Sequence, residues 1–546
     1  MAIVNFNKKI FEKEIGKIND EMQNKVSMFG TPVEHVVGNE IQIEVFPNRP
    51  DLLSYHGFKR AFLAYLGKKR GLYKYKVNPP EKNYKVIIDH SVRNVRPYTA
   101  CAIIKGLKFD DDKIKEIIDI QEKLHATVGR KRKRVAIGIY PLEKIKLPIT
   151  FKAIEPDKIK FIPIDSEKEM SGLEILRKHS TGEEYAHLLA GKEKFPFFFD
   201  SEKNVLSMPP IINSKATGKI TEKTKDVFVE CSGFDFEILK KCINILSTCL
   251  ADMGGKIYQM ELKYQKKEIT PNLKEEERKI SLENANRFLG LDLKENQLKN
   301  LIEKMGYDYK NKTVKIPAYR VDILHEVDLI EDVAIAYGYD NFIPEIPEIS
   351  TIGGENKNEI LKRKVSEILT GLEMLEVSNF HLTNKQNQFK KMSLKEKDFI
   401  EVEESRTDYS ILRKNLSHFL LKTLSENIDT EYPQRIFEIG KVFDNEGKIN
   451  EKESLGVAIS PGNFTEIRQI LEYFSKAIGV KIEISETNEF PNYFIDGRVV
   501  DIILNNKKIG FLGEVHPRIL RNWRIKMPVS LFEISLEEIF EGHQPK

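Results

Sequence analysis

Apolar and polar residues alternate with a period of two in several short stretches, which predicts half-buried β-strands. These include IQIEVFP (41–47), RVAIGIY (134–140) and KDVFVECSG (225–233). Between them the spacing changes to that of a helix. After Pro50 and Asp51, the residues Tyr55, Phe58, Phe62 and Leu66 form an apolar stripe, so we expect a helix that opens at 50–51 and stops at Gly67.

A pair of helices is predicted between residues 280 and 306. Ser281 is a candidate N-cap for LENANRFL, which Gly290 would end. The next helix carries Leu298, Leu301, Ile302 and Met305 on one face and stops at Gly306.

A third helix is predicted from His325 or Glu326 to Tyr337, with Gly338 as its stop, and it carries several acidic residues. Val327, Ile330, Ala334 and Tyr337 are spaced to face a core. Asp328, Glu331 and Asp332 share the opposite face, and Asp322 precedes the helix closely enough to fold back towards them. Converging carboxylates favour Mg²⁺, a hard cation that prefers oxygen ligands. The alternative is that these acids only complement the positive end of the helix dipole.

The order of these elements predicts an α+β multidomain protein. We expect a mixed N-terminal domain (1–80), an α+β domain (85–268), a helical-pair module (270–346) and a domain built on an antiparallel sheet (350–546). A chain of 546 residues is long enough for three or four domains.

Composition narrows the class of protein only a little. The 87 basic and 83 acidic residues leave a net charge of +4, which argues against a dedicated polycation but permits local basic patches. Cys101, Cys231, Cys242 and Cys249 form no CxxC pair, so we expect buried free thiols in a reducing compartment. No signal peptide or transmembrane run is evident, and the expected location is the cytoplasm, with no membrane partner.

Several motifs together carry a resemblance to a known family. PNRPDLLSYHGFKRAFLAYLG (47–67) and RVDI (320–323), followed by DLIEDVAIAYGYDNFIP (328–344), resemble signatures of the phenylalanine–tRNA ligase beta subunit. TGEEYAHLLAG (181–191) and NVLSMPPIINS (204–214) resemble its archaeal and eukaryotic form. The resemblance covers essentially the whole chain. It implies that Asp322, Asp328, Glu331 and Asp332 hold Mg²⁺ at the contact with an alpha subunit.

The same resemblance identifies residues 85–268 as a tRNA-editing domain that hydrolyses tyrosine wrongly attached to the phenylalanine tRNA. Glu230 and Ser232 are two apart on a strand, point to the same face and are candidates to bind the phenol. Leu206, Pro209 and Asn213 are candidate walls of that pocket. The basic turn GRKRKR (129–134) is either solvated or an RNA contact, and a Pro at 141, where the family usually has an acid nearby, counts against a site role there.

Residues 350–546 resemble a class II synthetase domain that has lost its ATP-binding arginines, with Arg435 and His516 left as structural residues. We therefore expect a non-catalytic beta subunit in a heterotetramer of two alpha and two beta chains, in which the alpha chain binds ATP and phenylalanine and charges the tRNA. The competing hypotheses are a free-standing hydrolase of mischarged tRNA and a nucleic-acid-binding protein that uses the helices near 280–305. Those helices are acidic and rich in Asn, which weakens the last idea.

Overall fold

The computed structural model describes residues 2–346, 348, 350–403, 405, 407–445 and 447–542. The chain forms two compact units, Met1–Ile346 and Pro347–Lys546. No helix among the described residues is both long and apolar enough to cross a membrane. Each of the four cysteines is buried, and none of them forms a disulfide.

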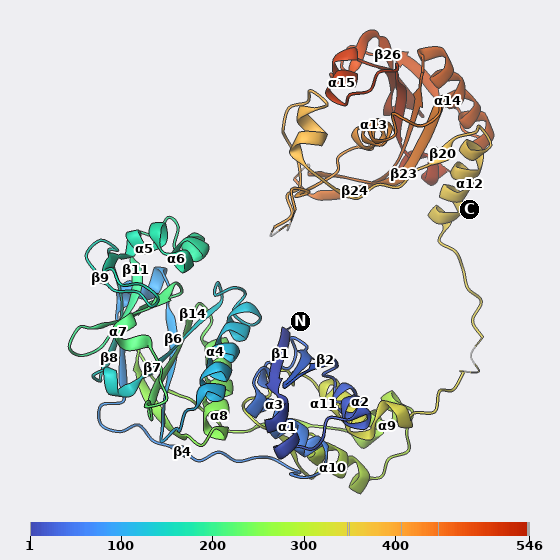
Figure 1. Cartoon of the computed structure of the whole chain (residues 1–546). Coiled ribbons are helices and arrows are strands. Elements are labelled where there is room, and N and C mark those ends of the chain that lie inside the picture. The colour runs from blue at the N-terminus through green and yellow to red at the C-terminus, as the bar shows by residue number, and fades with distance from the viewer. Residues whose placement is uncertain are drawn as a thin grey trace. The chain divides into compact units, whose positions relative to one another are not determined.

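The first unit begins with a three-stranded sheet and three helices (Figure 1). The sheet has the order β1 (Ala2–Asn7), β3 (Glu40–Val45), β2 (Val33–Val37), and its helices are α1 (Lys8–Glu14), α2 (Asp20–Met28) and α3 (Tyr55–Tyr65). The prediction that a helix opens at 50–51 is wrong. Residues 50–52 form a 3₁₀ turn, and α3 begins only after Ser54, whose Oγ accepts the N–H of Gly57 at 3.0 Å and so caps the helix.

An eleven-stranded sheet is the largest element of this unit. Its main path is β13 (Ile212–Asn213), β12 (Val205–Met208), β11 (Phe195–Phe199), β8 (Ile149–Ile154), β5 (Lys85–Ile88), β15 (Lys256–Lys263), β6 (Tyr98–Lys105), β14 (Val227–Gly233) and β7 (Val135–Pro141), and β4 (Val77–Asn78) and β16 (Lys267–Thr270) pair with β15. All three strand stretches predicted above lie in strands, two of them in this sheet.

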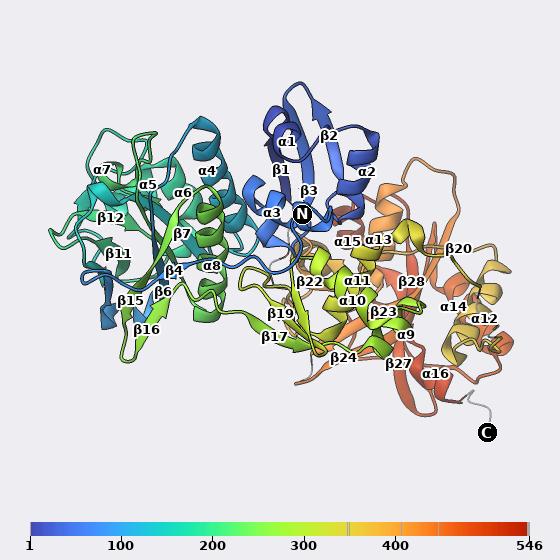
Figure 2. The ribbon, with the colours of Figure 1, turned by 90° about the horizontal axis from the view of Figure 1, so that it is seen from below.

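Each face of this sheet contributes to a different core, because successive side chains of a strand point in opposite directions. Ala100, Ala102 and Ile104 of β6 join one core with the helices α4 (Asp111–Ala126) and α8 (Phe236–Asp252), whereas Cys101 and Ile103 join the other. Figures 1 and 2 show α4 and α8 side by side. Beyond the second face lie short elements, namely β9 (Lys160–Phe161), β10 (Met170–Ser171), α5 (Gly172–Lys178), α6 (Ser180–Tyr185) and α7 (Lys215–Gly218).

The rest of the first unit is a helical module on a small sheet of order β17 (Glu276–Lys279), β19 (Thr313–Ile316), β18 (Asp308–Lys310). Its helices are α9 (Leu282–Leu289), α10 (Glu295–Lys304) and α11 (Glu326–Tyr337). The predicted ends of α9 are confirmed: Ser281 Oγ caps its start, and Gly290 ends it with φ 64°. The core of this module is continuous with that of the N-terminal helices and of α4 and α8.

The predicted core face of α11 is confirmed at Ile330 and Ala334 but is wrong at Val327. Val327, expected in the core, is 46% exposed, and the buried side chains are Leu329, Ile330, Val333, Ala334 and Ala336. The helix is therefore turned so that Asp332, expected among the outward acids, is also buried. The physical reason is the buried Arg320, whose guanidinium binds the Asp332 carboxylate at 2.7 Å.

The second unit is built on a seven-stranded sheet with α12 (Lys357–Thr370) and α14 (Phe464–Ile478) packed together on one face. Helices α13 (Ser417–Glu426) and α15 (Pro517–Asn522) belong to the core on the other face. The strand order is β20 (Leu375–Glu376), β23 (Gln434–Asn445), β24 (Ile449–Ser460), β28 (Ser530–Ser535), β27 (Lys507–Val515), β26 (Phe494–Leu504) and β25 (Glu483–Glu486). All neighbours are antiparallel except β20 and β23. A small pair, β21 (Leu382–Thr383) and β22 (Ile411–Leu412), and the last helix α16 (Glu537–Gly542) complete it.

A buried ion pair in this unit provides a test of its packing. Arg413 Nη1 lies 2.5 Å from Glu438 Oε1, and each side chain is 2% exposed. Glu438→Ala would leave the arginine charged and unpaired in the core, so we expect a loss of about 3–5 kcal/mol in the free energy of unfolding. Denaturant unfolding followed by fluorescence of Trp523, the single tryptophan of the chain, reports on this unit alone.

The matched control is Glu472→Ala, which removes a carboxylate from an exposed i,i+4 pair with Arg468. We expect the control to cost no more than about 0.5 kcal/mol. Equal losses in the two variants would contradict the stabilising role of the buried pair.

Candidate functional site

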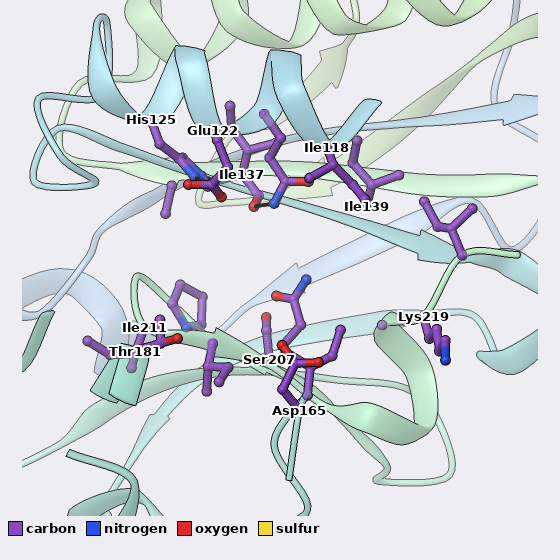
Figure 3. A pocket seen from close by; sticks show the side chains of 18 of the residues that line it. Ile118, Glu122, His125, Ile137, Ile139, Asp165, Thr181, Ser207, Ile211 and Lys219 are labelled. Carbon is purple, nitrogen blue, oxygen red and sulfur yellow. Dashed lines mark hydrogen bonds and ion pairs between the residues drawn. The ribbon is translucent and has the colours of Figure 1, made fainter. Parts of the chain in front are cut away.

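A cavity of about 840 Å³ lies beside the edge strand β7 of the large sheet. One wall is formed by helix α4 and by β7, and the opposite wall comes from residues 207–220 and 164–167. Figure 3 shows Ile118, Glu122 and His125 on the first wall, facing Ser207 and Ile211 on the second.

Glu230 is the most deeply buried acid of this cavity. It lies in the middle of β14, pairs with Gly138 of β7, and is 2% exposed. The hydroxyl of Tyr140 donates within 3.3 Å of both Glu230 Oε1 and Asn213 Oδ1, so it can serve one of these acceptors at a time. Among the described residues, neither Glu230 Oε2 nor the buried Ser207 Oγ has a hydrogen-bond partner. Two polar atoms in one cavity thus remain available to a ligand.

Burial governs the charge of Glu230. Removal from water raises its pKa to about 8, although the charge of Arg96 and the nearby hydroxyl groups of Tyr140 and Ser232 act to lower it. Arg96 itself is held by Ser232, its Nε lying 3.1 Å from Ser232 Oγ and its Nη2 2.5 Å from the Ser232 carbonyl oxygen. At neutral pH the Glu230 carboxyl is therefore mainly protonated and is a hydrogen-bond donor as well as an acceptor.

Gly138 makes room for this arrangement. A Cβ atom at this position would lie 2.1 Å from the Tyr140 hydroxyl oxygen and 2.7 Å from Glu230 Oε1. Any larger residue would push the tyrosine and the acid apart. The glycine inside the RVAIGIY strand is thus a sequence signal for the site, because glycine within a strand often marks a close approach.

The rim of the cavity is cross-linked by Arg132. Its Nη1 donates to the carbonyl oxygen of Ile211 at 2.8 Å, its Nη2 donates to Glu122 Oε1 at 3.1 Å, and its guanidinium lies 4.4 Å from the ring centroid of Tyr185. The turn that carries it is strained, with three successive non-glycine residues, 130–132, at φ 47°, 52° and 64°. Arg132 therefore ties the helix wall to the opposite wall.

His125 does not act as a free base here, since both ring nitrogens are engaged. Its Nε2 accepts the backbone N–H of Ile137 at 2.8 Å, and its Nδ1 lies 3.3 Å from Glu122 Oε1. Burial lowers the pKa of His125 below its ordinary value, which favours the neutral ring. Its role in the structure is to hold β7 and Glu122.

The structure brings together three of the five residues predicted for the pocket. Pro209, Asn213 and Glu230 line the cavity, whereas the buried Leu206 and Ser232 do not. Glu230 lies on an inner strand, since β14 pairs with β6 on one side and with β7 on the other.

Five further residues that line or support the cavity were not predicted from the sequence. Arg132 is one of them, since the basic turn was predicted only as a whole. A polar residue on the inner face of the α4 helix was the available signal for His125. The set is Glu122, His125, Arg132, Tyr140 and Ser207.

The four acids predicted to hold Mg²⁺ are only partly gathered. Arg320 donates to Asp322 at 2.9 and 2.8 Å and to Asp332 at 2.7 Å, and Tyr307 also donates to Asp332. Although burial acts in the opposite sense, the arginine lowers the pKa of Asp322. A guanidinium thus supplies the positive charge that two of these acids require.

The other two acids are placed differently. Asp328 Oδ2 accepts the N–H groups of Leu324 and His325, each at 2.7 Å, as part of the helix cap. Partial burial raises the pKa of Glu331, and the negative charges of the other three acids raise it further. Within the ranges that the structure describes, no group of three or more His, Cys, Asp or Glu residues is arranged to hold a metal ion.

The raised pKa of Glu230 predicts a dependence of stability on pH. Because the folded state favours the protonated acid, its contribution to stability is fully present below pH about 4.5 and is lost as the pH rises to about 8. Glu230→Gln, which cannot ionise, should remove this loss. The loss of stability is measured by hydrogen exchange of the β14 amides between pH 5 and 8, corrected for the intrinsic exchange rate. Glu193→Gln, at an exposed acid, is the control and should follow the wild type; a Glu230→Gln variant that does the same would refute the assignment.

Comparisons with known proteins agree with this architecture. Residues 278–339 match the model of the tRNA synthetase B5 domain, and residues 343–536 match that of the phenylalanyl tRNA synthetase beta chain CLM domain. The phenylalanine–tRNA ligase beta subunit of Thermococcus sibiricus is 41% identical over 507 residues, which cover 91% of this chain and 90% of that protein. The beta subunit of Archaeoglobus fulgidus is 38% identical over 543 residues, 97% of each chain.

A solved structure is similar to the first unit. The N-terminal fragment of the phenylalanyl-tRNA synthetase beta subunit from Pyrococcus horikoshii is 38% identical, with a TM-score of 0.59, and the match covers 62% of this chain and 99% of the fragment. The family predicted from the motifs is thereby confirmed. This chain belongs to the phenylalanine–tRNA ligase beta subunit family, and is a component of that aminoacyl-tRNA synthetase.

Proposed function

We propose that the cavity beside β7 is an editing site, at which this chain hydrolyses tyrosine wrongly attached to the phenylalanine tRNA. The observation that carries the proposal is the pair of buried, unpartnered polar atoms, Glu230 Oε2 and Ser207 Oγ, in a cavity that polar and apolar side chains line together. Tyrosine and phenylalanine differ by one hydroxyl group. A site built to hydrogen-bond that hydroxyl rejects the analogue lacking it, because its own buried polar groups are then left unpaired.

The protonation of Glu230 suits this task. A neutral carboxyl donates one hydrogen bond and accepts others, so it can bind a phenol without placing a charge in the cavity. Asn213, Tyr140 and Ser207 surround the same place with further donors and acceptors. The basic turn 129–134 at the rim lies where the polyanionic tRNA would approach.

The hydrolysis needs only water in addition to the substrate. Water adds to the ester carbonyl carbon, the bond between that carbon and the ribose oxygen breaks, and the ribose oxygen takes a proton. Tyrosine leaves as a carboxylate, the second proton of the water passes to the solvent, and the tRNA recovers its free hydroxyl. Among the described residues that line the cavity there is no Cys, and the single His has both nitrogens engaged, so the attack of an oriented water molecule fits better than a covalent route.

The second part of the proposal concerns assembly. The chain would act in the cytoplasm, as the scaffold for a catalytic alpha chain in a heterotetramer of two alpha and two beta subunits. ATP and phenylalanine would bind to the alpha chain, which attaches phenylalanine to the tRNA. A magnesium ion would be shared between Asp328 and Glu331 of this chain and ligands of the alpha chain, since Arg320 already serves Asp322 and Asp332. When bound, Mg²⁺ would supply positive charge at the contact between the subunits.

Removal of the acid should slow editing and spare charging. We expect Glu230→Ala to slow the hydrolysis of tyrosine from the phenylalanine tRNA by about 10- to 100-fold, the effect of losing a buried hydrogen bond to the phenol. Attachment of phenylalanine should be unchanged. The measurement is deacylation of tyrosine-charged tRNA by the complete alpha–beta complex.

The conservative variant Glu230→Gln, which retains a hydrogen-bond donor, should keep most of the activity. Gly138→Ala, which fills the space beside Tyr140, should behave like Glu230→Ala. Normal deacylation by the alanine variants would remove Glu230 from the site. Full activity of the chain without any partner would favour a free-standing hydrolase.

A separate experiment tests the shared ion. The double variant Asp328→Ala, Glu331→Ala should weaken association with the alpha chain, and removal of Mg²⁺ by a chelator should weaken wild-type association but not that of the variant. Asp340→Ala, which removes a nearby exposed acid, is the control. Equal affinities with and without Mg²⁺, measured by analytical ultracentrifugation, would rule out the metal role.

A further inference from the structure

The edge of strand β7 carries an unused pair of backbone groups inside the cavity. β7 pairs with β14 on one side only, so its other side is a free sheet edge. At Ile137 this edge is capped by helix α4: His125 Nε2 accepts the Ile137 N–H at 2.8 Å, and Gln121 Nε2 donates to the Ile137 carbonyl oxygen at 3.1 Å. Side chains of the helix thus replace the missing strand at this residue.

Ile139 is the next residue of the strand with the same orientation. In an antiparallel ladder, residues alternate between those whose N–H and C=O point to the paired strand and those whose groups point away. Since the groups of Ile137 point away from β14, those of Ile139, two residues further on, also point away. Its N–H and C=O are therefore directed to the free edge, where Ile139 lines the cavity (Figure 3).

The helix does not cap this second position. The residues of α4 that line the cavity before Gln121 are Ile117 and Ile118, one turn away, and Ile114, two turns away, and none of them has a hydrogen-bonding side chain. Ile118 is 56% exposed, so its side chain is accessible from the cavity. Among the described residues, no side chain and no backbone group from outside the sheet bonds to the main chain of Ile139.

We propose that the main chain of Ile139 binds the aminoacyl ester itself, pairing with it as a short added strand would. The N–H donates to the ester carbonyl oxygen, and the C=O accepts a hydrogen bond from the α-ammonium group of the amino acid. Ile118 covers the apolar part of the substrate. The same N–H then stabilises the negative charge that develops on the carbonyl oxygen when water adds.

This inference rests on the proposed editing function and deepens it. The phenol would be read by Glu230 and Ser207, whereas Ile139 would read the main-chain groups that all aminoacyl esters share. The two sets of contacts have different consequences for specificity. Loss of the phenol contacts reduces discrimination between tyrosine and phenylalanine, whereas loss of the Ile139 contacts slows the hydrolysis of every ester that enters the cavity.

Proline at this position tests the donor directly, because it lacks the N–H and is tolerated at strand edges. In the complete alpha–beta complex, we expect Ile139→Pro to lower kcat/KM for tyrosine-charged tRNA by about 10²- to 10³-fold, as for the loss of one donor to a developing oxyanion. Ile139→Val retains the N–H and a β-branched side chain and should stay within about threefold of the wild type. The ratio of tyrosine to phenylalanine hydrolysis should be unchanged in Ile139→Pro, unlike in Glu230→Ala.

A second measurement does not depend on the folding of the proline variant. Replacing the amide at 139 by an ester, through the α-hydroxy acid analogue of isoleucine, removes only the N–H. Binding of a non-hydrolysable tyrosyl-amide of adenosine to the full-length chain should weaken about tenfold or more in this variant, the effect of one lost hydrogen bond of about 1.4 kcal/mol. Equal affinity for the wild type and the ester variant, or equal kcat/KM for the proline and valine variants, would overturn the inference.

Failure of the proposed function gives a different result. A wild-type complex that does not hydrolyse tyrosine-charged tRNA would refute editing at this site. Binding of the adenosine analogue would then decide alone whether Ile139 recognises an aminoacyl group.

Discussion

An edge strand in a sheet must have its outward N–H and C=O groups satisfied or leave them available, and the site of this protein depends on how β7 meets that requirement. His125 and Gln121 reach from α4 to the main chain of Ile137 and fix the distance between the helix and the strand. Because the helix is held there, Glu122 is placed to bind Arg132, and Arg132 in turn reaches the carbonyl group of Ile211 on the opposite wall. The width of the cavity thus follows from the capping of one residue.

Buried charge is handled in two different ways in this chain. Arg413 and Glu438 in the second unit, like Arg320 with its two acids in the first, compensate burial by pairing opposite charges. Glu230 has no ion-pair partner within 4 Å among the residues that the structure describes and is instead neutralised by a proton, because the cost of removing a lone carboxylate from water exceeds the attraction of Arg96. Paired groups stabilise structure, whereas a protonated acid with one free oxygen is suited to bind a neutral polar ligand.

The acids of α11 illustrate how one surface can serve two purposes. Arg320 holds Asp322 and Asp332 inside the unit, and this contact fixes the rotation of the helix. Glu331 is exposed and Asp328 is half-buried, and partial burial together with the negative charges of the neighbouring acids raises the pKa of Glu331. The internal pair thereby orients an acidic surface without closing it.

The sequence by itself determined the elements whose signals are local. The ends of α9 follow from the hydroxyl of Ser281 and the left-handed Gly290, the bounds of α11 follow from its capping residues, and the period-two pattern located the strands β3, β7 and β14. The motifs also determined the family. These features depend on neighbours within a few residues, so they can be read along the chain.

Only the tertiary structure decided which of these residues face one another. Val327 and Asp332 exchanged their expected environments because Arg320, twelve residues before Asp332, is buried beside the helix. Glu230 is a buried neutral acid whose strand is flanked by residues 98–105 and 135–141. Leu206 packs in the core instead of lining the cavity, and Ser232 binds Arg96. The open edge at Ile139 depends on the register between a helix and a strand. Such contacts between distant segments leave no periodic trace in the sequence, because they are set by packing and by the cost of burying polar groups.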